Sequence, residues 1–448
     1  MSNSSDSTEL LDALLAEAVQ LHQRGQLEGA RRLYAQVLAA APEHVDALHF
    51  LGVLAHQIGL HDEAIELIGR AISRAPAHAD AHLNLGNVFL RVGKLDAAAA
   101  CYERVLALRP DSAAAHTNLG TVWRGRGDES AAIAAYQRAI ACDPGHADAH
   151  FNLGNALQRS NQIDAAVDAY LQAISLKPFA TRVHRVLGMI LYAIGRPLEA
   201  ATVYRNWLQL EPGNPTASHM LAACTGGTTP ARASDAYVRE TFDRFADSFE
   251  SKLAELDYQA PQLILEAVSQ LFAAPTAALQ VLDAGCGTGL CGPLLRPWAR
   301  GLAGVDLSLG MLEKARERGL YDELTHGELG AFLRARRNRY DLIASADTLV
   351  YIGALDAVAA AAAAALRPGG AFVFTVETFA DDTSPDRVIL GPHGRYTHGR
   401  AHVHEALSNA GMTLEILEPV VLRTELNQPV PGLLVAGRAA GTGPRISR

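Results

Sequence analysis

Residues 278–290 read ALQVLDAGCGTGL, and this stretch decides the fold of the second half of the chain. An apolar run at 279–282 ends in an acid, Asp283, and the glycine-rich turn GCGTG follows at once at 285–289. A sharp turn from a strand into a helix needs the positive φ that glycine adopts readily, and glycine lets the backbone approach a ligand. The amides at the start of the next helix then face that ligand. On its own, the pattern also fits a plain turn between a strand and a helix.

The composition of the whole chain is that of a globular protein. It has 448 residues, of which 49% are hydrophobic and 19% are charged, and its formal net charge is −9. The length suggests about three domains, and the balance of charge argues against nucleic acid or a membrane as the main partner. The five cysteines are scattered, without C-x-x-C or metal-ligand spacing, so we expect no metal site. The first ten residues have no apolar signal core and the longest apolar run is short for a bilayer span, so we expect a cytoplasmic protein.

The first half of the chain repeats every 34 residues. The interval predicts a pair of antiparallel helices per unit, in which small residues let the helices approach and proline ends the second helix. This pattern resembles the tetratricopeptide repeat and implies an all-α solenoid over 11–224, with a capping helix at 215–224. The units start near residues 11, 45, 79, 113, 147 and 181. The residues that keep the interval include Pro42, Pro76, Pro110, Pro144, Pro178 and Pro212, with Tyr34, Tyr102, Tyr136, Tyr170 and Tyr204.

Asparagines recur at equivalent positions of the first helix in several units, which line the concave face of such a stack. Their amides are able to hold the backbone of an extended peptide, so we expect a protein or peptide partner on this face. Asparagine is also common at these places in this repeat, and a solvated surface is the alternative. Histidines that recur in register at 82, 116, 150 and 184 are expected to be core residues rather than ligands. The candidate peptide-binding residues are Asn84, Asn87, Asn118, Asn152 and Asn155.

The second half alternates short apolar runs with helical stretches, which is typical of parallel βαβ units. Residues 225–234, TGGTTPARAS, break both patterns and are predicted to be a linker. A domain then follows at 235–437, and 438–448 is expected to be a disordered tail. The second predicted strand ends in Asp306, about 20 residues beyond the glycine turn, where an acid is placed to accept both hydroxyls of a ribose.

Four motifs in this half carry a family resemblance. They are VLDAGCGTG at 281–289, GVDLS at 304–308, DTLVYIG at 347–353 and LRPGGAFVFTVE at 366–377. In this order they resemble the motifs of class I S-adenosylmethionine-dependent methyltransferases, and with the repeats the chain is similar to bacterial predicted methyltransferases that carry tetratricopeptide repeats. The resemblance implies an α/β Rossmann-like domain with seven strands, and S-adenosyl-L-methionine as cofactor with S-adenosyl-L-homocysteine as product. The Gly-x-Gly-x-Gly spacing excludes a dinucleotide-dependent dehydrogenase.

The same resemblance implies roles for individual residues. Asp283 and the glycine turn would hold the methionine end of the cofactor, Asp306 the ribose and Glu328 the adenine amino group. Asp347 would lie beside the sulfonium, and Tyr351 would face the methyl acceptor. Cysteine is usual within this motif, so the thiol at 286 is expected to be packed rather than reactive. The cofactor-binding residues implied are Asp283, Gly285, Cys286, Gly287, Gly289, Asp306, Leu307, Met311, Glu328, Leu329, Ala346, Asp347 and Tyr351.

Methyl transfer from a sulfonium depends mainly on alignment and exclusion of water, so no catalytic triad is required. An acceptor that must lose a proton needs a base near the strand tips. The candidate bases are Asp347, Glu377 and His398. Polar residues of the insertion GPHGRYTHGR would orient an acidic substrate or carrier, and a solvated loop is the alternative. These candidate substrate-binding residues are Arg395, Tyr396 and Arg400.

Three interpretations of the function follow. The leading one is an S-adenosylmethionine-dependent methyltransferase whose repeat array recruits a protein substrate, carrier or scaffold. The second is a small-molecule methyltransferase whose array serves assembly only. The third is an interaction scaffold with an inactive methyltransferase fold, although the intact Asp283, glycine turn and Asp306 argue against a loss of cofactor binding.

Overall fold

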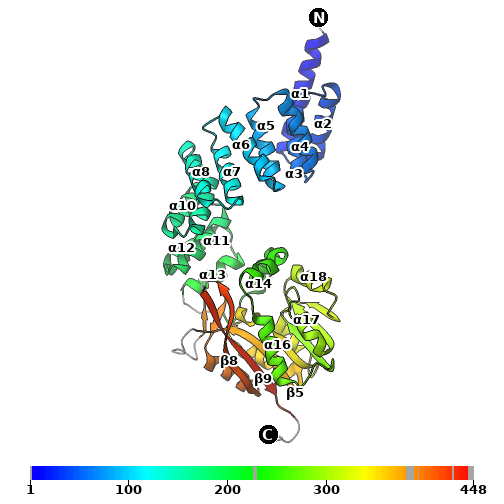
Figure 1. Ribbon diagram of the computed structural model, residues 1–448, viewed down its shortest axis with the longest axis vertical. Coiled ribbons are helices and arrows are strands. Elements are labelled where there is room, and N and C mark those ends of the chain that lie inside the picture. The colour runs from blue at the N-terminus through cyan, green and yellow to red at the C-terminus, as the bar shows by residue number, and fades with distance from the viewer. Residues whose placement is uncertain (1–2, 226–229, 380–387, 392, 426–427, 442–448) are drawn as a thin grey trace. The chain divides into compact units, whose positions relative to one another are not determined.

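The structure is a computed structural model that describes residues 3–225, 230–379, 388–391, 393–425 and 428–441 (Figure 1). The chain forms two compact units, Met1–Leu187 and Gly188–Arg448. The predicted linker lies partly outside the described residues, at 226–229, as does the end of the predicted tail, at 442–448. The predicted boundaries at 225–234 and 437 stay predictions. Within the described ranges no helix is both long and apolar enough to cross a bilayer.

Helices follow one another through the first half, as the repeat pattern predicts. Each second helix ends two residues before a recurring proline, for example at Ala40 before Pro42, because proline cannot continue a helix. The helices are α1 (Asn3–Gln23), α2 (Leu27–Ala40), α3 (Val45–Gln57), α4 (His61–Arg74), α5 (Ala79–Arg91), α6 (Leu95–Leu108), α7 (Ala113–Gly125), α8 (Glu129–Cys142), α9 (Ala147–Arg159), α10 (Ile163–Leu176), α11 (Thr181–Ala193), α12 (Pro197–Leu210) and α13 (Pro215–Thr225).

The recurring tyrosines and glycines hold the two helices of a unit together. Tyr136 is fully buried, and a Cβ atom on Gly120 would lie 2.7 Å from its ring, so the close approach requires glycine. The recurring histidines are half-buried rather than core, except the buried His184. His116 donates from Nε2 to the carbonyl of Pro110 at 3.0 Å, and therefore ties the turn before a repeat to its first helix.

A nine-stranded mixed sheet forms the second half, in the order β3-β2-β1-β4-β5-β7-β6 with β9 beside β5 and β8 beside β9. The strands β1 to β5 are mutually parallel, whereas β9 runs antiparallel to β5 and β8. The strands are β1 (Leu279–Ala284), β2 (Ala299–Asp306), β3 (Glu323–His326), β4 (Tyr340–Ser345), β5 (Leu366–Glu377), β6 (Val388–Leu390), β7 (Tyr396–His398), β8 (Met412–Glu425) and β9 (Gln428–Ala439).

Helices cover both faces of this sheet. Ile264 of α16 (Ala260–Leu271) packs in the same cluster as Val281, while Phe332 of α19 (Leu329–Arg334) and Val358 of α20 (Asp356–Ala365) share the other cluster with Leu282. Successive residues of β1 thus face opposite clusters, as a parallel strand buried on both sides requires. The other elements are α14 (Asp235–Phe245), η1 (Ala246–Ser248), α15 (Phe249–Glu255), α17 (Gly292–Leu295), η2 (Arg296–Trp298), α18 (Leu309–Glu317), η3 (Leu349–Tyr351) and α21 (Arg400–Asn409).

The Rossmann-like fold class is confirmed, and two strands were not predicted. Strand β7 falls in the polar insertion GPHGRYTHGR and β6 directly precedes that insertion. Strands of three residues are too short to show alternation. The long strands follow the predicted runs. The order of strands reverses at β1, which lies between β2 and β4, and a ligand of an open α/β sheet binds at such a point.

Candidate functional site

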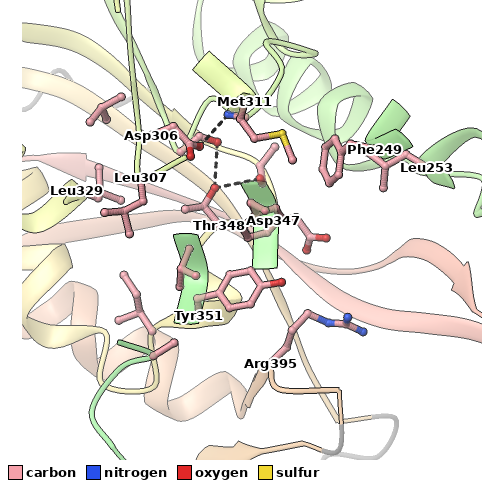
Figure 2. Close-up of a pocket in the computed structure, with 18 of the residues that line it drawn as sticks. Phe249, Leu253, Asp306, Leu307, Met311, Leu329, Asp347, Thr348, Tyr351 and Arg395 are labelled. Carbon is pink, nitrogen blue, oxygen red and sulfur yellow. Dashed lines mark hydrogen bonds between the residues drawn. The ribbon is translucent and has the colours of Figure 1, made fainter. Parts of the chain in front are cut away.

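A cavity of about 230 Å³ opens at the carboxyl ends of β1, β2, β3 and β4 (Figure 2). Its apolar side comes from Phe242, Phe249 and Leu253 of α14 and α15. Helix α14 is held to the start of α18 by Asp243, which accepts from the Ser308 hydroxyl at 2.5 Å. The sequence-predicted residues that line the cavity are Gly285, Gly287, Asp306, Leu307, Met311, Glu328, Leu329, Ala346, Asp347, Tyr351 and Arg395.

Asp306 ties the end of β2 to the glycine turn after β1. Its carboxylate accepts the amide of Gly287 on Oδ2 and the amide of Ser308 on Oδ1, both at 2.9 Å. Burial raises the pKa of Asp306, although these amides favour its charged form. Figure 2 shows the side chain at the cavity. A carboxylate has about four acceptor positions, so two remain for a ligand.

The glycines of the turn serve different purposes. A Cβ atom on Gly285, whose φ is +77°, would collide with the side chain of Thr348, so the chain packs too closely there for any other residue. Gly287 has a φ of +53° and would meet nothing within 4 Å, and since it lines the cavity, its missing side chain leaves room for a ligand.

Four of the five amides of the turn at 285–289 donate within the protein. Those of Gly285 and Cys286 donate to the carbonyl of Val305, that of Gly287 to Asp306 and that of Gly289 to Cys286. The turn therefore supplies room more than hydrogen-bond donors. Its role at the methionine end of a cofactor stays a prediction.

Asp283, Cys286 and Gly289 do not line the cavity. Asp283 is buried beneath the turn, where the Tyr321 hydroxyl donates to its Oδ2 at 2.6 Å, and burial raises its pKa to about 7. Burial also raises the pKa of the Cys286 thiol well above its ordinary value, so the thiol is packed and protonated. The sequence did not indicate Tyr321, which lies 38 positions from its partner.

Glu328 reaches the cavity but its carboxylate is engaged. It precedes α19 and accepts the amides of Gly330 at 2.8 Å and Ala331 at 2.6 Å, as a helix cap does. The predicted contact with an adenine amino group would use a remaining lone pair of the same carboxylate, and it stays a prediction. Leu307, Met311 and Leu329 give this end of the cavity an apolar lining.

A buried cluster of charges closes the other end. Arg423 of β8, whose side chain is 4% exposed, donates to Asp347 Oδ2 at 2.6 Å, to Glu425 at 2.7 Å and to Glu377. Arg395 donates to Glu377 at 2.5 Å and to Glu425 at 2.8 Å. The sequence did not indicate Arg423 and Glu425, because both lie in a strand far from the motifs. The only signal was RTE, a charged end that follows the apolar residues PVVL in that strand.

Asp347 combines two unusual properties in this cluster. Its backbone has a φ of +55°, which is costly for a residue with a side chain, and it follows the end of β4. Its Oδ1 is buried and has no hydrogen-bond partner among the described residues. Burial raises the pKa of Asp347, while Arg423 opposes the shift. Such strain with an unused acceptor is typical of a functional site.

Asp347 alone among the three candidate bases lines the cavity. Burial acts to raise the pKa of Glu377, but Arg395 and its neighbours hold it below its usual value, so this carboxylate stays charged and paired. His398 is fully buried and donates from Nε2 to the carbonyl of Ile352 at 2.8 Å. Burial lowers its pKa to about 4, so it is neutral at pH 7.

Among the three predicted substrate-binding residues, Arg395 lines the cavity. Tyr396 is buried, and its hydroxyl donates to the carbonyl of Pro230 at 2.8 Å. Arg400 donates to the carbonyl of Leu417 at 3.1 Å. Both side chains therefore serve the fold at their observed positions.

The predicted peptide-binding asparagines are half-buried, and several bond to one another or to neighbours. Asn87 accepts from the Tyr102 hydroxyl at 2.9 Å and from Asn118 at 2.8 Å. Asn84 bonds to His49 at 2.8 Å, and Asn155 accepts from the Tyr170 hydroxyl. Asn152 is half-buried in the same register. This ladder orders the side chains, and its use by a peptide stays a prediction.

Comparison with known proteins identifies both parts of the chain. The tetratricopeptide repeat model matches residues 15–81, 59–97, 83–147 and 151–215, and the methyltransferase domain model matches 281–370. Methyltransferase-like protein 27 of Homo sapiens is 41% identical over 90 residues, which are 20% of this chain and 37% of that protein. Malonyl-[acyl-carrier protein] O-methyltransferase of Erwinia pyrifoliae is 36% identical over 109 residues, 24% of this chain and 39% of that protein.

Solved structures are similar to parts of the chain. MamA is 30% identical with a TM-score of 0.33, covering 36% of this chain and 94% of that one. The structure of the APC/C hetero-tetramer Cut9–Hcn1 is 22% identical with a TM-score of 0.43, and the match covers 48% of this chain and 43% of that one. The chain spans between 25% and 39% of the length of the curated relatives it matches.

Residues 281–370, in the second half of the chain, thus match a methyltransferase domain. The protein as a whole carries tetratricopeptide repeats followed by that domain, as the motifs predicted.

Proposed function

We propose that the protein is an S-adenosyl-L-methionine-dependent methyltransferase whose repeat array recruits a protein substrate, carrier or scaffold. The observation that carries the proposal is the pairing of Asp306 with Gly287 at the point where the strand order reverses. There a carboxylate with free lone pairs and an open glycine face one cavity. These residues fit a ligand with a sugar diol.

The cofactor, when bound, supplies a methyl group on a sulfonium that needs no further activation. The chain's own residues then bind, orient and exclude water. Asp306 accepts hydroxyl donors, while Phe242 and Phe249 cover the cavity with apolar surface. Asp347 Oδ1 is the unused acceptor at the opposite end, and it is our candidate to hold or take a proton from an N–H or O–H acceptor.

The proposed role of the array rests on the asparagines of its first helices. A polar ladder repeated along a solenoid suits an extended peptide, whose amides and carbonyls also recur at regular intervals. The curated relatives include proteins named for methylation of malonyl-[acyl-carrier protein] and of trans-aconitate. One name contains a protein carrier and the other a small acid, so the acceptor is to be identified by experiment.

The test is to incubate the full chain with cell extract and methyl-radiolabelled S-adenosylmethionine. We expect label to run with protein, and a triple alanine variant at Asn84, Asn118 and Asn152 to lose that label while its affinity for S-adenosylhomocysteine stays the same. The control is a triple alanine variant at exposed glutamines of second helices, namely Gln36, Gln137 and Gln172. Label that runs with small molecules only, unaffected by the asparagine variant, would contradict recruitment by the array.

A further inference from the structure

The turn between β6 and β7 carries Arg395 to the cavity. It is tight, because the amide of Gly394 donates to the carbonyl of Gly391 at 3.0 Å and that of Gly391 donates to the carbonyl of Arg395 at 2.8 Å. The guanidinium of Arg395 then donates to Glu377 and Glu425 at the end of the cavity opposite the adenine side. The position of this arginine therefore depends on the position of the turn.

Helix α13, the last of the repeat-type helices, holds that turn from outside. His219 is buried and lies 2.9 Å from the carbonyl of Gly394, so its Nε2 carries the proton and donates. Its ring stacks on Tyr237 of α14, with 4.1 Å between ring centroids and 27° between planes. The Gly394 carbonyl thus receives a fixed, buried donor one residue before Arg395.

Glycine is required at the point of contact. Gly394 has a φ of +76°, and a Cβ atom there would collide with the Tyr237 hydroxyl and lie 3.3 Å from the sulfur of Met220. Helix α13 also contacts β6 and α14 directly. The turn is therefore fitted against α13 and α14.

The segment that follows α13 also contacts the site. The Tyr396 hydroxyl donates to the carbonyl of Pro230, and the amide of Ala233 donates to the carbonyl of Tyr351 at 2.8 Å. Arg232 and Ala233 themselves line the cavity. Residues within the predicted linker thus line the cavity and bond to the residue that follows Arg395.

We propose that His219 is a positioning residue for the methyl acceptor: through the Gly394 carbonyl it holds Arg395 between Glu377 and Glu425, so that a helix of the repeat type forms part of the acceptor site. The inference rests on the proposed function, because it concerns the acceptor end of the same cavity. It adds that loss of one histidine outside the methyltransferase motifs impairs transfer without impairing cofactor binding.

The test uses two variants of the full chain. His219→Leu keeps the bulk of the side chain and removes the donor, whereas His219→Gln keeps an N–H that reaches the same carbonyl. The control is His116→Leu, which removes the same kind of bond, from a histidine Nε2 to a backbone carbonyl, in α7 of the repeat array. The measurements are radiolabel transfer into extract, affinity for S-adenosylhomocysteine by calorimetry, and amide hydrogen exchange of residues 393–398.

For His219→Leu we expect a loss of transfer of about tenfold, which corresponds to one buried hydrogen bond left unmade, with affinity for S-adenosylhomocysteine within twofold of wild type. His219→Gln should recover at least half of the rate, and His116→Leu should transfer at the wild-type rate. Wild-type transfer by His219→Leu, or no recovery by His219→Gln, overturns the proposal.

Failure of the proposed function gives a different result. If the wild-type chain neither binds S-adenosylhomocysteine nor transfers label, the methyltransferase assignment fails, and hydrogen exchange then decides the role of His219. Faster exchange at 393–398 in His219→Leu but not in His219→Gln supports positioning. Equal exchange in all variants overturns it.

Discussion

The sharpest prediction concerns Asp306, whose carboxylate faces the cavity with two acceptor positions left after the amides of Gly287 and Ser308. A hydrogen bond to a charged group contributes about 1.5 kcal/mol at the low end. Two ribose hydroxyls would therefore lose about 3 kcal/mol in Asp306→Ala, a roughly hundredfold weaker affinity for S-adenosylhomocysteine. Asp306→Asn retains one carbonyl oxygen without charge and should lose about tenfold.

Calorimetry with S-adenosylhomocysteine measures these affinities. The matched control is Asp322→Asn, because Asp322 also accepts a backbone amide, that of Leu302 at 2.8 Å, but lies before β3 at the opposite edge of the sheet. Circular dichroism must show that each variant is folded at the temperature of the titration. Equal affinity for the wild type and Asp306→Ala would refute the assignment of this carboxylate to a ribose.

Three further predictions follow from the same geometry. Gly287→Ala should weaken S-adenosylhomocysteine binding at least tenfold, whereas Gly93→Ala, with a similar φ and equally open space, should cost only the local strain of about 1 kcal/mol in a thermal melt. Arg423→Met leaves buried carboxylates unpaired, so chemical denaturation at pH 7 should show a free energy of unfolding that is lower by about 3–5 kcal/mol. This loss should shrink toward pH 4 as the carboxylates are protonated, and a loss that does not depend on pH would contradict the prediction. Asp283→Asn tests the pKa of Asp283, which burial raises to about 7. The folded state holds a proton that the unfolded state releases near pH 4, so the wild-type free energy of unfolding should fall between pH 4 and 7 by up to about 4 kcal/mol. The variant should lack that fall.

The sequence was sufficient to predict those parts of the site that lie on one βαβ unit. The glycine turn and Asp306 are close in sequence, and the geometry of a parallel pair of strands places the turn after β1 beside the end of β2. That is why the spacing predicted their juxtaposition.

The charge cluster could not be predicted in this way. Arg423 meets Asp347 and Glu377 only because β9 pairs antiparallel with β5 and carries β8 beside it. The partners lie 76 and 46 positions apart, and a pairing over such distances leaves no local pattern. His219 is similar: nothing near it in sequence indicates that it bonds to Gly394, 175 positions away.

The attachment of β8 through β9 has a consequence for synthesis on the ribosome. Strand β8 pairs with β9 and not with the body of the sheet, so Arg423 has no fixed place until β9 has been translated. Chains grow at roughly 5–20 residues per second and fold from the amino end. The helical array therefore emerges many seconds before Arg423 reaches its place in the second half. Under the proposed function, a nascent chain would already hold its partner before the site is complete.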